Sequence, residues 1–382
     1  MAGIYVHIPF CKQACNYCNF HFSVSKKQIP EMVHAIAREA VMQTQFLKQP
    51  MIDTLYFGGG TPSLLNIQQL VQLITTIQQQ YTLAADAEIT LEVNPDDCTP
   101  LALQQWRHAG INRLSMGVQS FRDANLLWMN RSHHATAALQ AIVQAHAAGF
   151  DNISIDLIYG IPQLTNEAWH QNIHKALSLP IQHLSCYALT VEPKTALHHS
   201  IQKKSKDNID IDAQAKQFEL LMQWLPEADF EQYEVSNFAK PGYQSRHNNS
   251  YWKGIPYIGL GPSAHSYNGT WRQWNIANNS LYIQNIQNGN IPAEKEILTP
   301  AQKRNEQIMI ALRTKEGIQF SKLDDNWTNR HQKQLIHAAQ KWITQGLMEW
   351  LPQKEQLHLT PKGMLYADGI AADLFEVNAS LH

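Results

Sequence analysis

The feature that most constrains this fold is an alternation, through about residue 190, of short β-branched or aromatic segments with longer helical segments. The alternation is typical of βα units, in which helices connect successive parallel strands. We expect strands at residues 4–8, 54–57, 89–93, 113–116, 153–158 and 183–189. We expect the intervening helices at residues 30–47, 67–80, 101–109, 135–148 and 166–179. Six units are too few for an eightfold barrel, and no Gly-x-Gly-x-x-Gly motif follows the first strand, so this α/β pattern predicts a partial, open (β/α)6 barrel.

We place the barrel in residues 1–195 and expect a connecting region in residues 196–297. This second region is less regular and is rich in Asn, Gln, Gly, Tyr and Trp. One helix is expected at residues 212–225, and the remainder is expected to form loops and short strands.

The third region, residues 298–382, begins with Thr299 and Pro300, a helix cap followed by proline at the first helical position. Three helical stretches follow, and then a β-hairpin is expected at residues 347–351 and 356–360. Helices followed by a hairpin predict a C-terminal α+β domain of the winged-helix type. Because its charges nearly balance, we expect a structural or interaction domain rather than a DNA-binding one.

Charge and hydropathy exclude several classes of protein. The chain has 30 Lys and Arg against 32 Asp and Glu, so no basic surface is expected to attract nucleic acid. No apolar run reaches the roughly 18 residues that a membrane span needs, and residues 1–9 lack the basic and apolar segments of a secretory signal. We therefore expect a cytoplasmic protein that does not bind nucleic acid.

Three of the five cysteines fall within eight residues, with the spacing C-x3-C-x2-C. Cys11, Cys15 and Cys18 directly follow the first expected strand, and barrel proteins build their sites at the carboxyl ends of strands. Three thiolates can bind three irons of a [4Fe-4S] cluster and leave the fourth iron open for another ligand. The alternatives are three unconnected thiols or a zinc site with His7 or His21 as the fourth ligand.

This spacing resembles that of the radical S-adenosylmethionine (SAM) superfamily, and further motifs narrow the resemblance. They resemble, in the same order, those of the coproporphyrinogen III oxidase-like family, over nearly the whole chain. The motifs are YVHIPFC at 5–11, GGGTPS at 58–63, LEVNP at 91–95, GVQSF at 117–121, DLIYGIP at 156–162 and HNNSYW at 247–252.

The resemblance implies that the three cysteines bind a [4Fe-4S] cluster and that SAM binds its open iron. It implies that further residues contact SAM: Tyr5, Tyr17, Gly59, Gly60, Thr61, Glu92, Gln119, Arg131, Asp156 and Ala188. Residue chemistry is compatible with this. Glycines allow close backbone approach to a ligand, Glu92 can accept hydrogen bonds from ribose hydroxyls, and Arg131 can donate hydrogen bonds to a carboxylate. Taken singly, such residues are also explained by a tight turn or an ordinary surface position.

Two features depart from the oxidase branch of that family, which carries C-x3-C-x2-C-x-C and a long N-terminal extension. Here Phe20 stands where the last cysteine would be, and only ten residues precede Cys11. The chain resembles instead the HemW branch of haem chaperones. This implies haem as cargo, acceptor haemoproteins that can be membrane-associated, and no catalytic residues for decarboxylation. An oxygen-independent coproporphyrinogen III oxidase stays open as the alternative, whereas the near-neutral charge disfavours an RNA-modifying enzyme.

The HNNSYW motif carries the candidate haem contact, His247. An imidazole can be an axial haem ligand, and flanking aromatic rings can pack against a macrocycle. His265 and the pair His133 and His134 are weaker candidates. Among 18 histidines, a surface or hydrogen-bonded role is the alternative for any one. Whether SAM is cleaved and whether the chain forms a homodimer are left open by the sequence.

Overall fold

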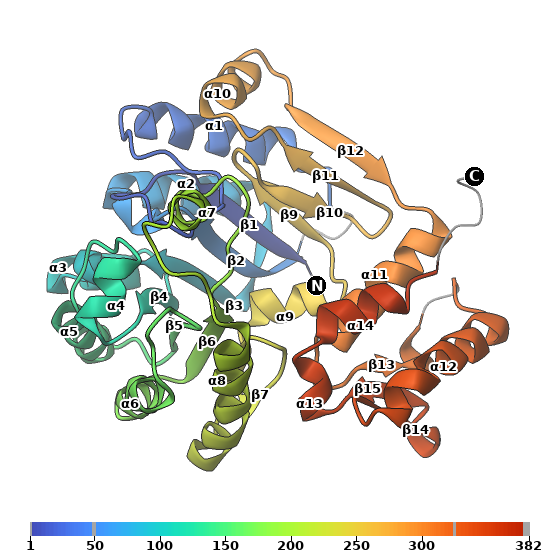
Figure 1. Ribbon diagram of the computed structural model, residues 1–382. Helices are drawn as coiled ribbons and strands as arrows, with labels where there is room; N and C mark the ends of the chain where they lie inside the picture. Colours follow the sequence, from blue (N-terminus) through green and yellow to red (C-terminus); the bar gives the residue numbers. More distant parts are fainter. Residues whose placement is uncertain (1, 48–50, 324–325, 377–382) are drawn as a thin grey trace.

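Six parallel strands form the centre of the molecule in a computed structural model that describes residues 2–47, 51–323 and 326–376 (Figure 1). In sheet order, which is also chain order, they are β1 (Gly3–Ile8), β2 (Met51–Gly59), β3 (Thr82–Val93), β4 (Arg113–Gln119), β5 (Ile153–Tyr159) and β6 (His183–Ala188). Strands such as β1 and β4 are buried almost continuously, because parallel strands joined by helices have both faces covered. The expected partial α/β barrel is confirmed.

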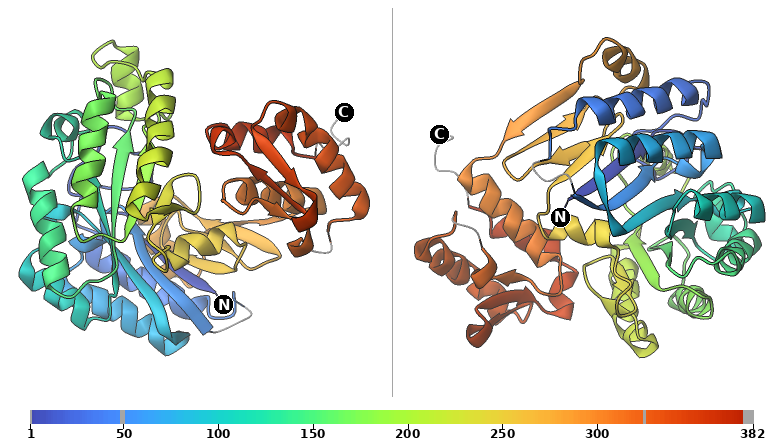
Figure 2. Two further views of the ribbon diagram at one scale, coloured as in Figure 1. Left: turned by 90° about the horizontal axis from the view of Figure 1, so that it is seen from below. Right: turned by 180° about the vertical axis from the view of Figure 1, so that it is seen from behind.

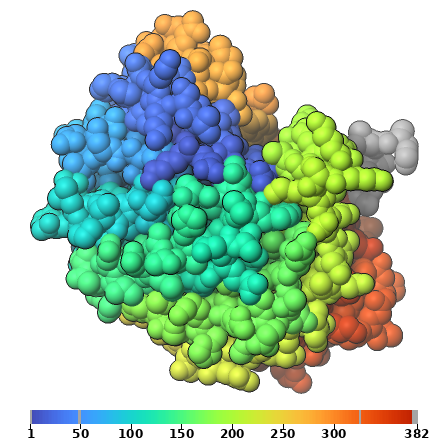
Figure 3. All heavy atoms as spheres, turned by 60° about the vertical axis from the view of Figure 1, so that its left-hand side comes forward, coloured from blue at the N-terminus to red at the C-terminus, as the bar shows by residue number. Residues whose placement is uncertain are grey.

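Helices connect these strands over the outer surface, where successive units follow one another from blue to green (Figure 3). They are α1 (Ile29–Met42), α2 (Ile67–Gln80), α3 (Pro100–His108), α4 (Asp123–Trp128), α5 (Ala135–Ala147) and α6 (Asn166–Leu177). Local sequence explains α2, since Asn66 accepts the N–H of Gln69 at 2.9 Å and Gln69 accepts that of Asn66 at 3.0 Å. Only α4 was not expected, because six residues are too few to show a helical period.

The chain then returns along the β6 edge of the sheet. It forms α7 (Ala196–Gln202), α8 (Ile211–Trp224), β7 (Glu231–Gln232) and β8 (Asn237–Ala239). Strand β8 pairs antiparallel with β6, and β7 pairs with β8. Helix α8 lies where the sequence predicts one, at residues 212–225.

The rest of the second region extends the opposite edge. Its elements are α9 (Arg246–Trp252), β9 (Tyr257–Leu260), β10 (His265–Tyr267), β11 (Trp271–Asn275), α10 (Asn279–Gln287) and β12 (Ala293–Ile297). Strand β9 pairs parallel with β1, and β10 to β12 continue the sheet antiparallel. The buried Glu39 of α1 accepts the N–H of Gly261 and the side-chain amide of Asn275, each at 2.7 Å. Residues 196–297 therefore flank the barrel sheet on both sides.

The C-terminal module packs helices around a three-stranded sheet in the order β13-β15-β14. Its elements are α11 (Pro300–Leu312), β13 (Ile318–Gln319), α12 (Asn329–Thr344), β14 (Met348–Leu351), β15 (Gln356–Leu359), α13 (Pro361–Met364) and α14 (Ala367–Asp373). Strands β14 and β15 form the expected hairpin. The 3-10 helices of the chain are η1 (Pro62–Leu64), η2 (Pro95–Asp97), η3 (Pro226–Ala228), η4 (Phe320–Lys322) and η5 (Pro352–Lys354).

The module stands beside the barrel (Figure 2). Helix α11 contacts α9, and α13 contacts α8. The N–H of Val235 donates to the carbonyl of Arg313 at 2.9 Å, and Glu234 forms a β-bridge with Thr314. These contacts place the module beside the carboxyl end of β6. None of the helices in the described ranges is long and apolar enough to cross a membrane.

Candidate functional site

A cavity of about 990 Å³ lies between the carboxyl ends of the barrel strands and the C-terminal module. This is at the upper end of the roughly 300–1,000 Å³ that small-molecule sites occupy. Most of the residues expected to hold the cluster or SAM line it: Cys11, Cys15, Tyr17, Cys18, Gly59, Gly60, Thr61, Glu92, Gln119, Arg131, Asp156 and Ala188. Two expected site residues, Tyr5 and His247, are not part of this lining.

The three cysteines lie on the loop between β1 and α1, and backbone hydrogen bonds hold that loop. The N–H of Cys11 donates to the carbonyl of Ser23 at 3.0 Å, and that of Cys18 to the carbonyl of Cys15 at 3.3 Å. The pKa of the Cys11 thiol is raised to about 11, chiefly by burial and also by the neighbouring thiols, against the hydroxyl of Thr61 and the charge of Arg131. Three thiols this close oppose one another's ionisation, so a cationic centre that they share would be needed to hold them as thiolates.

The zinc alternative requires His7 or His21 beside the cysteines. The buried His7 has Nδ1 3.1 Å from the hydroxyl of Tyr5 and Nε2 3.0 Å from the carbonyl of His21. Nε2 of His21 lies 2.8 Å from Oδ1 of Asn279. Across the part of the chain that the structure describes, no three His, Cys, Asp or Glu side chains converge on one ion position. A cluster, in which each thiol binds a different iron, does not need such convergence.

Arg131 joins the cysteine loop to the ends of β3 and β4. Its Nη1 donates to Sγ of Cys15 at 3.3 Å, and its Nη2 donates to Oδ1 of Asn94 at 2.9 Å and to the carbonyl of Gly117 at 2.8 Å. A Cβ on Gly117 would lie 3.2 Å from Nη2. Nε is buried and has no hydrogen-bond partner among the described residues. The guanidinium is therefore fixed beside the thiols with one donor unused.

Gly59 and Gly60 bring the end of β2 against the cysteine loop. Gly59 has φ +106°, a conformation that residues with a Cβ rarely adopt. A Cβ on Gly60 would lie 2.5 Å from the carbonyl oxygen of Phe10 and 2.8 Å from that of Ile8. Thr61 follows at once, and its hydroxyl bonds the thiol of Cys11. The GGGTP motif thus forms a turn whose backbone packs closely on the β1 loop.

Two carboxylates line the cavity from β3 and β5. Glu92 accepts the hydroxyl of Tyr56 at 2.7 Å and the N–H of Gly59 at 3.1 Å. Burial raises the pKa of Glu92 to about 7 and that of Asp156 to about 6, while a hydrogen bond from Ser185 opposes the shift of Asp156. Both groups titrate near neutrality, so a ligand that donates hydroxyls to them would favour their ionised forms.

Gln119, Tyr17 and Ala188 complete the expected set. Gln119 ends β4 with φ +65°, where the pairing with β5 is irregular, and such backbone conformations are concentrated at functional sites. Burial raises the pKa of Tyr17, whose hydroxyl is hydrogen-bonded to Cys15. Ala188 is the last residue of β6, where a small side chain leaves room in the cavity.

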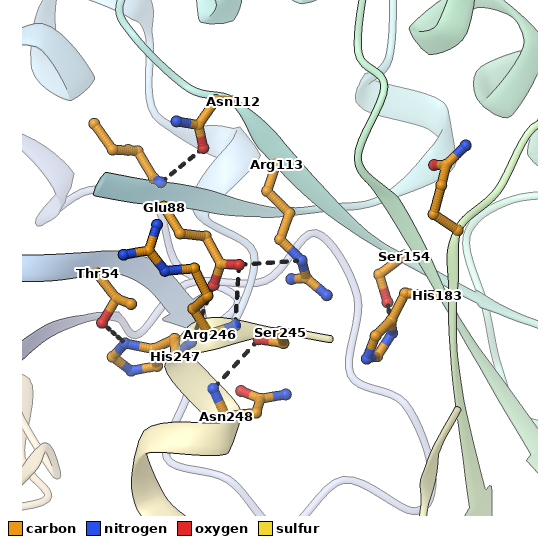
Figure 4. A network of polar contacts seen from close by, with 12 residues as sticks. Thr54, Glu88, Asn112, Arg113, Ser154, His183, Ser245, Arg246, His247 and Asn248 are labelled. Atoms are coloured by element: carbon orange, nitrogen blue, oxygen red, sulfur yellow. Dashed lines mark hydrogen bonds and ion pairs between the residues drawn. The ribbon is translucent and has the colours of Figure 1, made fainter. Parts of the chain in front are cut away.

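Tyr5 and His247 lie inside the barrel, closer to the amino ends of its strands. The rings of Tyr56 and His247 stack at 4.9 Å, and that of Tyr5 lies 6.0 Å from Tyr56. Glu88 accepts the backbone N–H groups of Arg246 and His247, both at 3.0 Å, and so anchors the start of α9 (Figure 4). The HNNSYW motif thus closes the lower end of the barrel.

The expected haem contact at His247 does not agree with this conformation. Nδ1 lies 2.8 Å from Oγ1 of Thr54 and Nε2 lies 2.9 Å from the hydroxyl of Tyr251, so neither nitrogen is open to an iron. The residue is 2% exposed, and burial lowers its pKa to about 3. The motif made the imidazole conspicuous in sequence, but its burial depends on the packing of α9 under β2. Of the weaker candidates, His133 has Nε2 3.0 Å from the carbonyl of Val118.

Sequence reasoning missed the outer wall of the cavity. This wall consists of residues from α8 and from the C-terminal module: Ile211, Asp212, Gln214, Ala215, Phe218, Arg313, Met364, Leu365, Tyr366, Ala367, Asp368 and Gly369. No local motif marks them, because they approach the cysteines only through tertiary packing. In sequence, Ile211 stands out as an apolar residue between Asp210 and Asp212, whereas Tyr366 follows Met364 and Leu365 and is not marked.

Comparison with known proteins connects this geometry to a family. Residues 5–176 match the family model described as the radical SAM superfamily. The chain is 32% identical to a protein named heme chaperone HemW from Mycobacterium tuberculosis, over 97% of this chain and 94% of that protein. It is 35% identical to the protein of the same name from Bacillus subtilis, over 83% and 85% of the two chains.

One solved structure has the same fold over almost the whole chain. It is that of coproporphyrinogen III oxidase (HemN) from Escherichia coli, described as a radical SAM enzyme. The TM-score is 0.84, and the match covers 98% of this chain and 90% of that one. At 23% sequence identity, this likeness concerns the fold alone.

Proposed function

The chain belongs to the HemW family of radical SAM proteins, and from this membership we propose that it is a haem chaperone, which binds haem and transfers it to acceptor haemoproteins. The observation that carries the proposal is its 31% to 35% identity to proteins named heme chaperone HemW, over 83% to 97% of this chain. Phe20 supports it, because an aromatic side chain replaces the cysteine of the oxidase branch.

The residues of the cavity fit a [4Fe-4S] cluster and SAM. Cys11, Cys15 and Cys18 would hold the cluster, because they supply three thiols from one loop and face one cavity. The unused Nε of Arg131 suits the carboxylate of SAM, and the close backbone at Gly60 leaves no space for a side chain. When bound, the two groups supply one-electron chemistry at the open iron.

The chain's own residues would position SAM and shape its surroundings. Arg131 holds a positive charge beside Cys15 and offers a donor to a carboxylate. Glu92 is placed to accept ribose hydroxyls, since Tyr56 and Gly59 orient its carboxylate. Apolar side chains such as Val93 also line the cavity and limit the access of water. Formation of 5′-deoxyadenosine distinguishes SAM cleavage from a purely regulatory role of SAM.

Phe20 lies on the cysteine loop and lines the cavity, yet is 67% exposed. A cysteine at this place would add a fourth thiol to the loop, whereas phenylalanine adds an apolar surface beside the cluster ligands. A flat, apolar macrocycle can pack against such a surface, which supplies no additional metal ligand. This position favours a haem carrier over a porphyrin-oxidising enzyme.

The alternative function is oxygen-independent coproporphyrinogen III oxidation. Anaerobic reconstitution of the cluster, followed by haem titration and assays for 5′-deoxyadenosine and decarboxylated porphyrin, distinguishes the two. We expect haem to bind and coproporphyrinogen to remain unchanged. Porphyrin decarboxylation would overturn the chaperone function in favour of the oxidase.

We further propose a division of labour among the three regions. Residues 1–195 would bind the cluster and SAM, residues 196–297 would brace the barrel, and residues 298–382 would serve as an interaction domain. The acceptors would be cytoplasmic or membrane-associated haemoproteins. Haem transfer to an apo-haemoprotein can be monitored by absorbance for the full chain and for a variant that lacks residues 298–382. The comparison of the two tests the last assignment.

A further inference from the structure

We propose that Arg313 binds a propionate of haem on the outer wall of the cavity, and that Phe20, Ile211 and Tyr366 contact the macrocycle. The inference rests on the proposed function, and it names the group of haem that the outer half of the cavity would bind. It differs from ligation by His247, whose ring nitrogens both have other partners.

Large apolar side chains gather here with unusually high exposure. Phe20 is 67%, Ile211 76% and Tyr366 54% exposed, although all three line the same cavity. They come from the cysteine loop, from α8 and from the segment between α13 and α14. Exposed apolar residues that converge from distant segments on one cavity indicate a ligand that covers them.

The cavity lining contains two cations, Arg131 and Arg313. Arg131 is engaged by Cys15, Asn94 and Gly117 on the wall where the cysteines lie. A carboxylate in the outer part of the cavity therefore has Arg313 as its available cation. Haem has an apolar ring with two propionates on one edge. The wall likewise combines three apolar side chains with one guanidinium, and it also carries the carboxylates of Asp212 and Asp368.

Arg313 is held in a way that suits exchange of its anionic partner. Its guanidinium lies over the ring of Trp252, with Cζ 5.4 Å from the ring centroid. Its Nη1 is paired with the carboxylate of Asp368, whose side chain is 75% exposed, and exposed pairs contribute little to stability. Nε has no hydrogen-bond partner among the described residues. Trp252 can keep the guanidinium plane in position while a ligand carboxylate replaces Asp368.

Trp252 also gives the HNNSYW motif a different connection to the ligand. His247 anchors the start of α9 inside the barrel, and Trp252 ends that helix under Arg313. The motif therefore supports a cation of the cavity wall from behind rather than contacting the iron.

The test compares haem with haem dimethyl ester, which lacks free carboxylates. Each ligand is titrated into the reconstituted wild-type protein and the Arg313→Gln variant. We expect Arg313→Gln to weaken haem binding by roughly tenfold or more, as for the loss of a charged hydrogen bond, and to leave binding of the ester unchanged. Equal weakening of both ligands, or no change with either, would overturn the proposal.

Two further variants separate binding from folding. Asp368→Asn releases Arg313 and is expected to tighten haem binding, a result that general damage to the module would not produce. Arg107→Gln is the matched control, because Cζ of Arg107 lies 5.4 Å from the ring of Phe150 and outside the cavity lining. It should leave haem binding unchanged, and an effect equal to that of Arg313→Gln would contradict the assignment. If the wild-type protein binds neither haem nor the ester, the proposed function itself fails.

Discussion

The guanidinium of Arg131 donates to Sγ of Cys15 at 3.3 Å, so a fixed positive charge faces one of the thiols assigned to the cluster. The same guanidinium holds Asn94 and Gly117, which brings the ends of β3 and β4 to the cysteine loop. A single side chain thus links the expected cluster ligands to the expected SAM-binding edge.

Replacing Arg131 by glutamine should weaken SAM binding about tenfold or more while the cluster still assembles. The neutral amide cannot form a charged hydrogen bond with a carboxylate, a loss of roughly 1.5–3 kcal/mol, but the three thiols are unaltered. Equilibrium binding of SAM, with iron and sulfide content measured on the same samples, checks this. Arg122→Gln, an exposed position at the other end of α4, is the control. Unchanged SAM affinity in Arg131→Gln would remove Arg131 from the site.

Cysteine replacements should fall into two groups. Alanine at position 15 should abolish the cluster's absorption and iron content, because only two thiols would remain. Alanine at position 98 or 186 should retain both, since Cys98 and Cys186 are buried outside the cavity. Anaerobic reconstitution with metal analysis measures the difference. Loss of iron from Cys186→Ala in a folded protein would contradict the assignment.

Glu92 should make stability depend on pH between about 4.5 and 7. Its folded pKa is raised from 4.5 to about 7, chiefly by burial and also by Asp156, against the hydrogen bonds from Tyr56 and Gly59 and the charge of Arg113. The folded state therefore holds this proton more tightly than the unfolded state does. The contribution is complete below pH 4.5 and is lost as pH rises toward 7.

The Glu92→Gln variant tests this pH dependence. Its free energy of unfolding, measured by denaturant titration from pH 4.5 to 7.5, should fall less with rising pH than that of the wild-type protein. SAM should bind more tightly to the wild-type protein as Glu92 ionises, since the carboxylate accepts ribose hydroxyls, and the variant should lack this step. Identical pH profiles for the two proteins would show that Glu92 does not titrate in this range.

Replacing His247 by alanine should destabilise the protein by about 1–3 kcal/mol, because Thr54 and Tyr251 lose buried hydrogen bonds. Haem affinity, measured on the folded fraction, should not depend on an iron–imidazole bond from this residue. Denaturant unfolding and the haem absorption spectrum together check both statements. His146→Ala, at an exposed position that is not among the candidate haem contacts, is the control. Loss of the haem spectrum with stability intact would instead make His247 a haem ligand.

Much of the barrel could be predicted because its signals are local. In the apolar strands and in amphipathic helices such as α2, the hydrophobic period can be read from consecutive residues. Strands β9 to β12 could not be placed, since segments of three to five residues show too little period to be told from loops until β9 pairs with β1. The buried Glu39 that joins this extension to α1 looks in sequence like an ordinary surface residue of a helix.

The sequence by itself determined which residues are expected to form the inner site, because residue types and their spacing, such as Cys11 to Cys18, are properties of one short segment. The tertiary structure decided what is accessible. It buried His247 between Thr54 and Tyr251. It also brought Arg313 and Tyr366 to the cavity that Cys11 lines. The physical reason is that burial and the convergence of distant segments depend on how helices pack on a sheet, and no local pattern encodes them.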